Sequence, residues 1–471
     1  ATLLVATAAT AWQVHRTIAA ERVAMLQERL QIACGYDDQD EYAQAEELLR
    51  ELHDPCLAAF GPQHPNAEQI RLRLGGVLIG QGQIDEGLPL VKDAARALAA
   101  VSGNVPQDVP AYLKRLSDRC VELFGKRWPH ERSTPAEKDR ALALARCAVE
   151  LHRSPASCYR LAWAWSVKGD WGNCANELQE SLPLSGVFTR AFDRWSLLAR
   201  AHWHLGDKQV ARDWLAAICA LKPESELPRV QQVELRDLRG LLEVPETWPA
   251  ADGQPDEMLE TLTRLIERHP AAYALYAVRG GRYLSDGAWR PAAADFAKFL
   301  EGEPSHRWGW QQLAVASLCG GDTAGYDAAC RGAFKYLSEE TARWNRVTLI
   351  QILCLAPRDD CDRVLPMAEE VGGTYKDWEA RFALGMAQYR CGRWREAVDV
   401  WESLSENADS VAVLAFRAMA ECRLGQIETA QRMLDESRRK FDLTQTPYGF
   451  YRCLDRLALA EAEGLLRQVA T

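Results

Sequence analysis

The stretch that decides the fold is residues 195–223, WSLLARAHWHLGDKQVARDWLAAICALKP. Two amphipathic segments of good helix formers flank a Gly206-Asp207 turn, and Pro223 ends the second segment. A small residue, Ala199, occupies the position where two such helices would cross closely. The stretch therefore predicts one antiparallel pair of helices.

The same turn recurs along the chain at a nearly constant spacing. Gly-Asp, Gly-aromatic and related turns begin at Gly169, Gly206, Gly287, Gly321, Gly392 and Gly425, and are separated by 37, 81, 34, 71 and 33 residues. Because the two long gaps are about twice the short ones, we expect a helix pair without this turn at 224–264 and another at 337–371.

The residues around these turns resemble the tetratricopeptide signature, W-x2-L-G-x2-Y followed by A-x3-F and P. A small residue stands at the predicted helix crossing in six copies, namely at Ala162, Ala199, Gly280, Ala314, Gly385 and Ala418. Residues 60–65, FGPQHP, resemble the turn of the kinesin-light-chain type of this repeat. No useful strand alternation occurs. The resemblance implies an all-α fold, an α-solenoid of tetratricopeptide-type helix pairs.

Segments rich in Pro and Gly, which interrupt helices, divide the array further. We expect a candidate membrane-span remnant at 1–13, N-terminal repeats of the longer variant type at 14–103, a linker with one helix at 104–134, central repeats at 135–243, a linker or hinge at 244–254, tetratricopeptide and irregular helix pairs at 255–440, and a capping helix at 441–471.

The first twelve residues are small and apolar, and Arg16 and Arg22 follow them. A bilayer needs about twenty residues in a helix. The segment is therefore interpreted as the end of a membrane span, as a soluble first helix, or as a signal-peptide remnant. A short apolar seam that could pair two copies of the chain follows at Val23, Leu26, Leu30 and Ala33.

Composition excludes several classes of partner and cofactor. The net charge is −10 and no dense Lys/Arg block occurs, so nucleic acid is not an expected partner. The 14 cysteines show no CxxC pair and no regular ligand spacing, so no zinc site or disulfide framework is predicted. Most are expected to be small core residues, as Cys174 is at a repeat position that prefers alanine.

No catalytic motif is present, so we predict that the chain is not an enzyme and has no catalytic residue, metal site or cofactor. Phosphate-binding loops, zinc-protease and hydrolase motifs and calcium loops are all missing. His202 and His204 are two apart on a helix and point to different faces. We expect His202 to pack in the core and His204 to face outward.

Several strings resemble the repeat region of large bacterial receptor-type serine/threonine protein kinases. They are RALALAR at 140–146, KGDW at 168–171, AHWHLGD at 201–207, FAKFL at 296–300, WGWQQLA at 308–314 and YRCGRWREA at 389–397. The resemblance implies a kinase domain and one membrane span before the repeats. The chain itself lacks the HRD, DFG and glycine-rich kinase motifs. The alternative function is therefore that of a regulatory fragment of a membrane-anchored serine/threonine protein kinase whose catalytic domain is absent from this chain.

The predicted function is protein–protein interaction, as a scaffold or sensor arm that binds a protein or peptide in the concave groove. Candidate partner-binding residues, assigned by repeat register, are Tyr159, Trp163, Arg200, Trp203, His204, Tyr389, Arg390 and Arg423. The alternative is that these side chains only pack against neighbouring repeats. The localisation stays open between a membrane-anchored protein with soluble repeats and a cytoplasmic one. The kinase resemblance favours repeats outside the cytoplasm, whereas unpatterned cysteines favour a reducing compartment.

Overall fold

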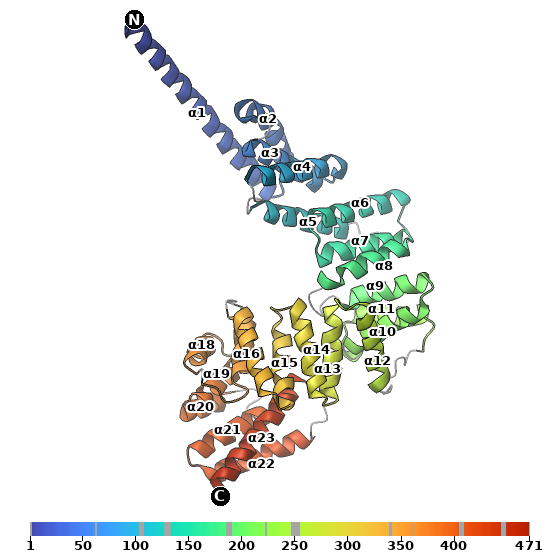
Figure 1. Ribbon diagram of the computed structural model, residues 1–471, viewed down its shortest axis with the longest axis vertical. Coiled ribbons are helices and arrows are strands. Elements are labelled where there is room, and N and C mark those ends of the chain that lie inside the picture. The colour runs from blue at the N-terminus through green and yellow to red at the C-terminus, as the bar shows by residue number, and fades with distance from the viewer. Residues whose placement is uncertain are drawn as a thin grey trace. The chain divides into compact units, whose positions relative to one another are not determined.

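The computed structural model describes residues 2–61, 64–102, 108–126, 133–184, 191–221, 224–245, 255–338, 342–359, 361–404, 409–443 and 449–470. All regular elements in these ranges are helical, with 23 α-helices and two single-turn 3-10 helices (Figure 1). The chain divides into two compact units, Ala1–Ser181 and Leu182–Thr471.

The first unit contains four consecutive helix pairs. Its helices are α1 (Thr2–Asp38), α2 (Tyr42–Phe60), α3 (Pro65–Gly80), α4 (Ile84–Ser102), α5 (Asp108–Lys126), α6 (Pro135–Leu151), α7 (Pro155–Val167) and α8 (Trp171–Ser181). The first helices of the pairs, α1, α3, α5 and α7, contact one another in sequence. Helix α5, which the sequence placed within a linker, packs here as the first helix of a pair with α6.

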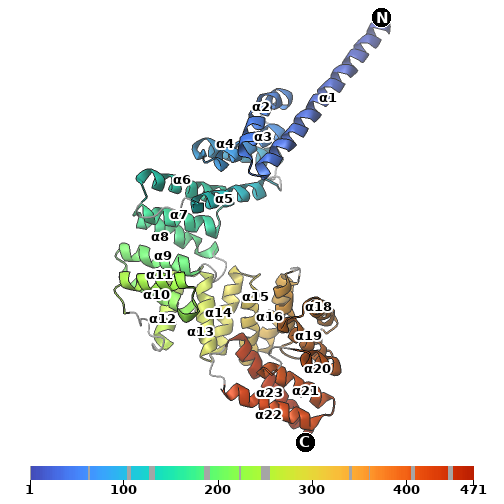
Figure 2. The ribbon, with the colours of Figure 1, turned by 180° about the vertical axis from the view of Figure 1, so that it is seen from behind.

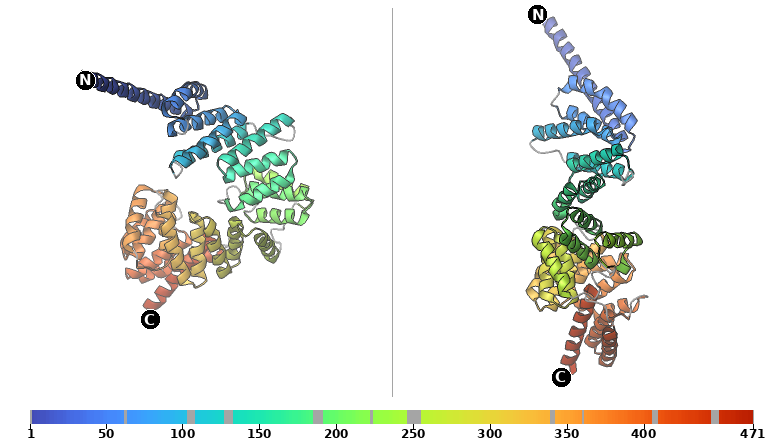
Figure 3. Two further views of the ribbon diagram at one scale, coloured as in Figure 1. Left: turned by 45° about the horizontal axis from the view of Figure 1, so that its top comes forward. Right: turned by 90° about the vertical axis from the view of Figure 1, so that its right-hand side faces the viewer.

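The second unit continues with the same construction. Its helices are α9 (Ala191–His204), α10 (Lys208–Leu221), α11 (Arg229–Leu241), α12 (Pro255–Arg268), α13 (Tyr273–Ser285), α14 (Trp289–Gly302), α15 (Arg307–Cys319), α16 (Thr323–Leu337), α17 (Arg343–Leu353), α18 (Cys361–Thr374), α19 (Trp378–Arg390), α20 (Trp394–Glu402), α21 (Val411–Arg423), α22 (Ile427–Leu443) and α23 (Phe450–Ala470). Figure 2 shows these consecutive pairs from behind, and Figure 3 from two further directions.

Capping side chains explain several helix starts. Thr134 accepts a hydrogen bond from the Glu137 backbone, and the Glu137 carboxylate accepts one from the Thr134 backbone, so α6 begins with a capping box. Ser154 and Ser157 do the same for α7. In both helices a proline occupies the first turn, where its missing N–H costs no hydrogen bond.

The turn glycines predicted from the sequence all adopt a left-handed backbone. Gly169, Gly206, Gly287, Gly321, Gly392 and Gly425 have φ angles between 73° and 89°. Residues with a Cβ rarely adopt this conformation, so glycine here reverses the chain between the two helices of a pair. This confirms the repeat punctuation.

The predicted crossing positions are confirmed by tight packing. Ala162, Ala199, Ala314 and Ala418 are fully buried. A Cβ added at Gly385 would lie 2.2 Å from Nε1 of Trp401, which is itself fully buried. Only a small residue therefore lets α19 approach α20 this closely.

The two long gaps in the repeat each contain two helices, but they pack differently. In the first gap, α11 packs against α9 and α12 packs against α10 and α13. In the second, α17 and α18 pack against each other as an ordinary pair. Residues 246–254 of the expected hinge at 244–254 lie outside the described residues. Pro223, which the sequence placed at the end of a repeat, also lies outside them.

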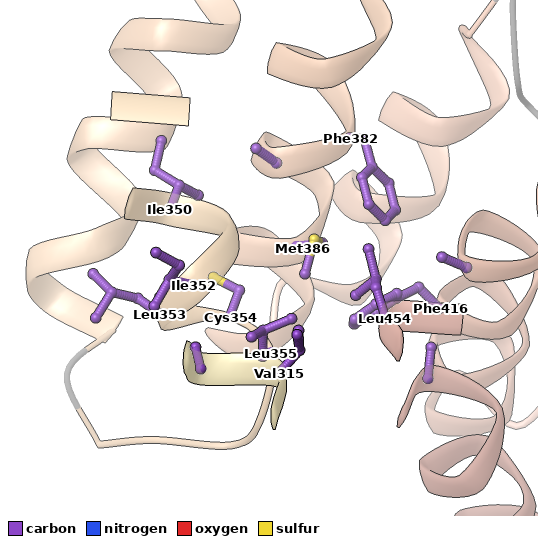
Figure 4. Close-up of a cluster of buried hydrophobic side chains, with 14 of the residues drawn as sticks. Val315, Ile350, Ile352, Leu353, Cys354, Leu355, Phe382, Met386, Phe416 and Leu454 are labelled. Atoms are coloured by element: carbon purple, nitrogen blue, oxygen red, sulfur yellow. The ribbon is translucent and has the colours of Figure 1, made fainter. Parts of the chain in front are cut away.

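One continuous apolar core runs from α13 to α23. Figure 4 shows Leu454 of α23 beside Phe416 of α21, with Met386, Leu355 and Val315 in the same cluster. Helix α23 packs against α21 and α22, its neighbours in the chain, and also against α15. The segment expected to be a capping helix therefore reaches a repeat that lies more than a hundred residues earlier.

The buried cysteines confirm their predicted role as core residues. Thirteen are described without a disulfide, and nine of these are buried, including Cys174. The pKa of the Cys174 thiol is raised to about 12 by burial. Among the described residues, no helix is long and apolar enough to cross a bilayer.

Candidate functional site

The eight residues assigned to partner binding are divided between the two units. Tyr159 and Trp163 are on α7 of the first unit, whereas the other six are in the second unit. Within the second unit they form two groups, one on α9 and one on α19 and α21. The contacts of each group show what it can do.

In the α7 group, Trp163 packs against a core cluster and Tyr159 is half-buried beside its neighbour Arg160. Trp163 is partly buried and packs against the cluster of Phe124, Leu142 and Leu161. The guanidinium of Arg160 lies 6.0 Å from the centre of the Tyr159 ring. These contacts hold the side chains within the repeat.

In the α9 group, Trp203 packs against the second helix of its own pair, and Arg200 lies near Glu234 of α11. Nζ of Lys208 lies 4.5 Å from the centre of the Trp203 ring, and the Arg212 guanidinium lies 5.9 Å away. As predicted, His204 is exposed and His202 is 8% exposed. Burial lowers the pKa of His202, while Asp207 opposes that shift through a 3.4 Å contact with Nδ1.

In the α19 and α21 group, Tyr389 and Arg390 are buried near α23, whereas Arg423 is exposed. Tyr389 is 6% exposed and meets Phe416 edge-on at 5.8 Å between ring centres. Arg390 donates from Nε to the carbonyl of Cys354 at 2.9 Å and from Nη2 to the carbonyl of Leu355 at 3.0 Å. Both of its Nη atoms also donate to the Glu461 carboxylate of α23. Another part of this chain therefore already occupies the position assigned to a partner.

A more open surface lies at the starts of α15, α17, α19 and α23. We call it the aromatic strip: Trp344, Tyr375, Trp378 and Tyr451 with Arg307 and Arg343. Trp344 is 42% exposed and Tyr451 is 51% exposed, although large aromatic side chains are normally buried. The Trp378 and Tyr451 rings are 6.0 Å apart between centres, which joins α19 to α23 along the strip.

Two arginines give the aromatic strip its charge. The Arg343 guanidinium lies 4.3 Å from the centre of the Trp344 ring and 4.8 Å from that of Tyr375, and it forms an ion pair with Asp377. The Arg307 guanidinium lies 5.6 Å from the Trp344 ring centre and has no ion pair among the described residues. Partial burial of the hydroxyl and the nearby Glu379 carboxylate raise the pKa of Tyr451, and Arg307 opposes that shift.

Part of the aromatic strip recurs in the sequence at the repeat spacing, although this recurrence did not enter the sequence prediction of the site. Trp308, Trp344 and Trp378 are 36 and 34 residues apart, which is the repeat spacing. Their exposure could not be read from that spacing. Trp308 packs edge-on against Phe296 at 5.5 Å between ring centres, whereas Trp344 is left open.

The first unit contains a second concentration of charge, which is internally paired. Asp37 is 5% exposed and accepts hydrogen bonds from Arg73 at 2.9 Å and from the Tyr112 hydroxyl at 2.9 Å. Arg115 pairs with Asp37 and Asp38. This network joins α1 to α3 and α5. Because the charges of the two carboxylates and the two guanidiniums cancel, it offers little net charge to a ligand.

No group of three or more His, Cys, Asp or Glu that could hold a metal ion occurs within the ranges the structure describes. The pocket of about 160 Å³ between α16, α17 and α18 is lined by Arg331, Arg358 and Arg363 with apolar neighbours. Arg358 already pairs with Asp327.

The fold defines the class of protein: an all-α array of tetratricopeptide-type helix pairs. Similar solved structures include yeast Tom70, at 14% identity with 95% of this chain and 97% of that chain covered and a TM-score of 0.29. The APC/C hetero-tetramer Cut9-Hcn1 matches at 13% identity, with 97% and 99% covered and a TM-score of 0.30. TTC0263, a thermophilic TPR protein in Thermus thermophilus, matches at 16% identity, with 45% and 98% covered and a TM-score of 0.21.

No protein-family model matches the chain, and no curated protein matches it. The assignment to this class rests on the helix pairs, turn glycines and crossing residues described above.

Proposed function

We propose that this protein is an interaction scaffold that binds a peptide segment of a partner protein at the aromatic strip. The observation that carries the proposal is the exposure of Trp344 and Tyr451 beside the guanidinium of Arg307. Trp, Tyr and Arg dominate the binding energy of protein interfaces. Exposed aromatic surface of this kind is typical of binding sites.

Charge indicates the kind of peptide. Arg307 has no carboxylate partner in the described part of the chain, and Arg343 shares Asp377 with the helix start of α19. A peptide with one acidic side chain next to an apolar or proline residue would pair with Arg307 and cover Trp344. An extended acidic segment is therefore the expected ligand.

A peptide-display selection against the full chain tests this proposal. Enriched peptides are expected to carry Asp or Glu beside an apolar residue. Their affinity should fall by roughly thirty-fold, or about 2 kcal/mol, in a Trp344→Ala, Arg307→Glu variant. Val230→Ala is the matched control, because Val230 is 78% exposed on α11 and outside the strip. Peptides that bind the strip variant and the control equally well would contradict the proposal.

A sensor arm coupled to a membrane-anchored serine/threonine kinase is a second proposal. The strings at 140–146, 168–171 and 201–207 support it, and the kinase residues would lie outside this chain. Sequencing the gene upstream of residue 1 tests it. A kinase domain followed by one membrane span would support the coupling, and an unrelated upstream gene would contradict it.

A further inference from the structure

Helix α23 lies across helices that are far from it in the chain. Its Glu461 pairs with Arg390 of α19, its Tyr451 contacts Trp378 at the start of α19, and it packs against α15 and α21. Consecutive members of α13, α15, α17, α19 and α21 contact one another, as the first helices of successive pairs. Helix α23 is therefore laid over the row of first helices.

The buried face of α23 has the pattern of a helical ligand. Its buried apolar side chains recur at helical spacing and are Phe450, Cys453, Leu454, Ala458, Leu459, Ala462, Leu465 and Leu466. Amphipathic helices bind surfaces through anchors at this spacing. Leu454 enters the cluster around Phe416 that Figure 4 shows.

Polar contacts fix the position of α23 along the row. The Glu461 carboxylate meets the Arg390 guanidinium with both oxygens. Cys453 of α23 belongs to the core cluster against which Cys319, at the end of α15, also packs. Asp455 lies near the backbone of Ala412 at the start of α21.

The contacts of Glu461 and Asp455 also carry an energetic cost that lowers the docking free energy of α23. Arg390 has a side chain that is only 6% exposed, and Glu461 is 28% exposed, so docking removes both charges from water at a cost. Burial raises the pKa of Asp455 to about 6, so this group carries a disfavoured charge at neutral pH. Helix α23 is therefore bound less tightly than its apolar contacts alone would make it.

We propose that the surface beneath α23, formed by α15, α19 and α21 around Arg390 and Phe416, is a docking surface for a partner's amphipathic helix, and that α23 competes for it. The partner helix would carry leucine and alanine on one face and a carboxylate placed to meet Arg390. The aromatic strip borders this docking surface, because its Tyr451 lies on α23 and contacts Trp378 of α19. The two proposals are tested separately, since the α23 peptide probes the docking surface and the selected acidic peptides probe the strip.

The α23 sequence itself supplies the probe. A fluorescent peptide with the sequence of residues 449–470 is titrated into the full chain and followed by anisotropy. The wild-type chain should bind it weakly, because its own α23 is present at a high effective concentration. A Leu454→Ala, Leu459→Ala chain keeps the docking surface and loosens α23, so it should bind the peptide at least tenfold more tightly.

The ion pair tests specificity. A peptide carrying Glu461→Arg should bind the loosened chain at least tenfold more weakly, and an added Arg390→Glu substitution in that chain should restore its binding. If the loosened chain keeps its helical circular dichroism and still does not bind the wild-type peptide, the docking surface is refuted. Equal binding by wild-type and loosened chains would refute the competition.

Hydrogen exchange on the unmodified chain keeps the proposal testable if the loosened variant does not fold. Amides of α23 should exchange at least tenfold faster than those of α19 and α21, because α23 can leave while the row of first helices stays folded. Equal protection of α23 and α21 would show that α23 is a fixed part of the core, and would overturn the proposal.

Discussion

Removing the carboxylate of Glu461 should release α23 more strongly than any other single charge removal on this helix. The substitution is Glu461→Gln, which keeps the size of the side chain. Arg390 would keep the carbonyls of Cys354 and Leu355, with Nε and Nη2 at 2.9 and 3.0 Å from them. Its buried guanidinium would lose the carboxylate that both of its Nη atoms meet.

The magnitude follows from the burial of the two partners. Breaking a fully buried ion pair costs about 3–5 kcal/mol. Arg390 is 6% exposed, but Glu461 is 28% exposed, so water and the glutamine oxygen can partly replace the carboxylate. We therefore expect a loss of about 2 kcal/mol in the free energy that holds α23 in place, which is roughly thirty-fold in an equilibrium constant.

Hydrogen exchange of the α23 amides measures this free energy locally, which suits an array that need not unfold in one step. Glu463→Gln is the matched control. Glu463 lies on the same helix and pairs with Arg438, whose side chain is 50% exposed, so its loss should cost less than about 1 kcal/mol. Equal acceleration of exchange in the two variants would refute the reasoning. An Arg390→Met, Glu461→Leu variant should recover most of the loss, because no buried charge remains.

Three further predictions concern packing, pH and the thiols. Gly385→Ala should destabilise the second unit by about 2 kcal/mol, since its Cβ would lie 2.2 Å from Nε1 of Trp401. Gly281→Ala, whose Cβ would meet nothing within 4 Å, should be neutral or stabilising by up to about 1 kcal/mol. Urea unfolding compares the two variants, and similar losses of stability would contradict the packing argument. Because the pKa of Asp455 is raised from 3.8 to about 6 in the docked helix, the docking free energy of α23 is greatest below pH 3.8 and falls as pH rises through about 6. Asp455→Asn should therefore slow hydrogen exchange of the α23 amides relative to wild type at pH 7 but not at pH 4. An equal ratio of exchange rates at both pH values would contradict this assignment. A thiol reagent should label few cysteines in the native chain and 14 after denaturation without reductant, because nine of those described are buried; a lower denatured count would reveal disulfides.

Local pattern made most of the array predictable. Gly206 and its equivalents need a left-handed backbone, and Gly385 needs close helix contact; both requirements follow from residues within a single helix pair. The burial of Cys174 and His202 was predictable for the same reason, since the repeat register sets which face of a helix meets its partner.

The site was much less predictable. Repeat register made Trp203 and Arg390 equal candidates for partner binding. In the structure Trp203 contacts Lys208 and Arg212 of its own pair, whereas Arg390 pairs with Glu461 of α23. The recurrence of Trp344 was visible in the sequence, but its exposure depends on which neighbouring side chains cover it.

The sequence by itself therefore determined the class of this protein: helix pairs, their turns and their crossing points. Each of these is set by contacts within a repeat of about 35 residues. Only the tertiary structure decided which surfaces the array leaves open. The position of α23 depends on contacts with α15, α19 and α21 taken together, and Glu461 meets a residue 71 positions away. A local sequence pattern cannot show which distant segments come into contact. The aromatic strip and the docking surface can therefore be identified only in the folded chain.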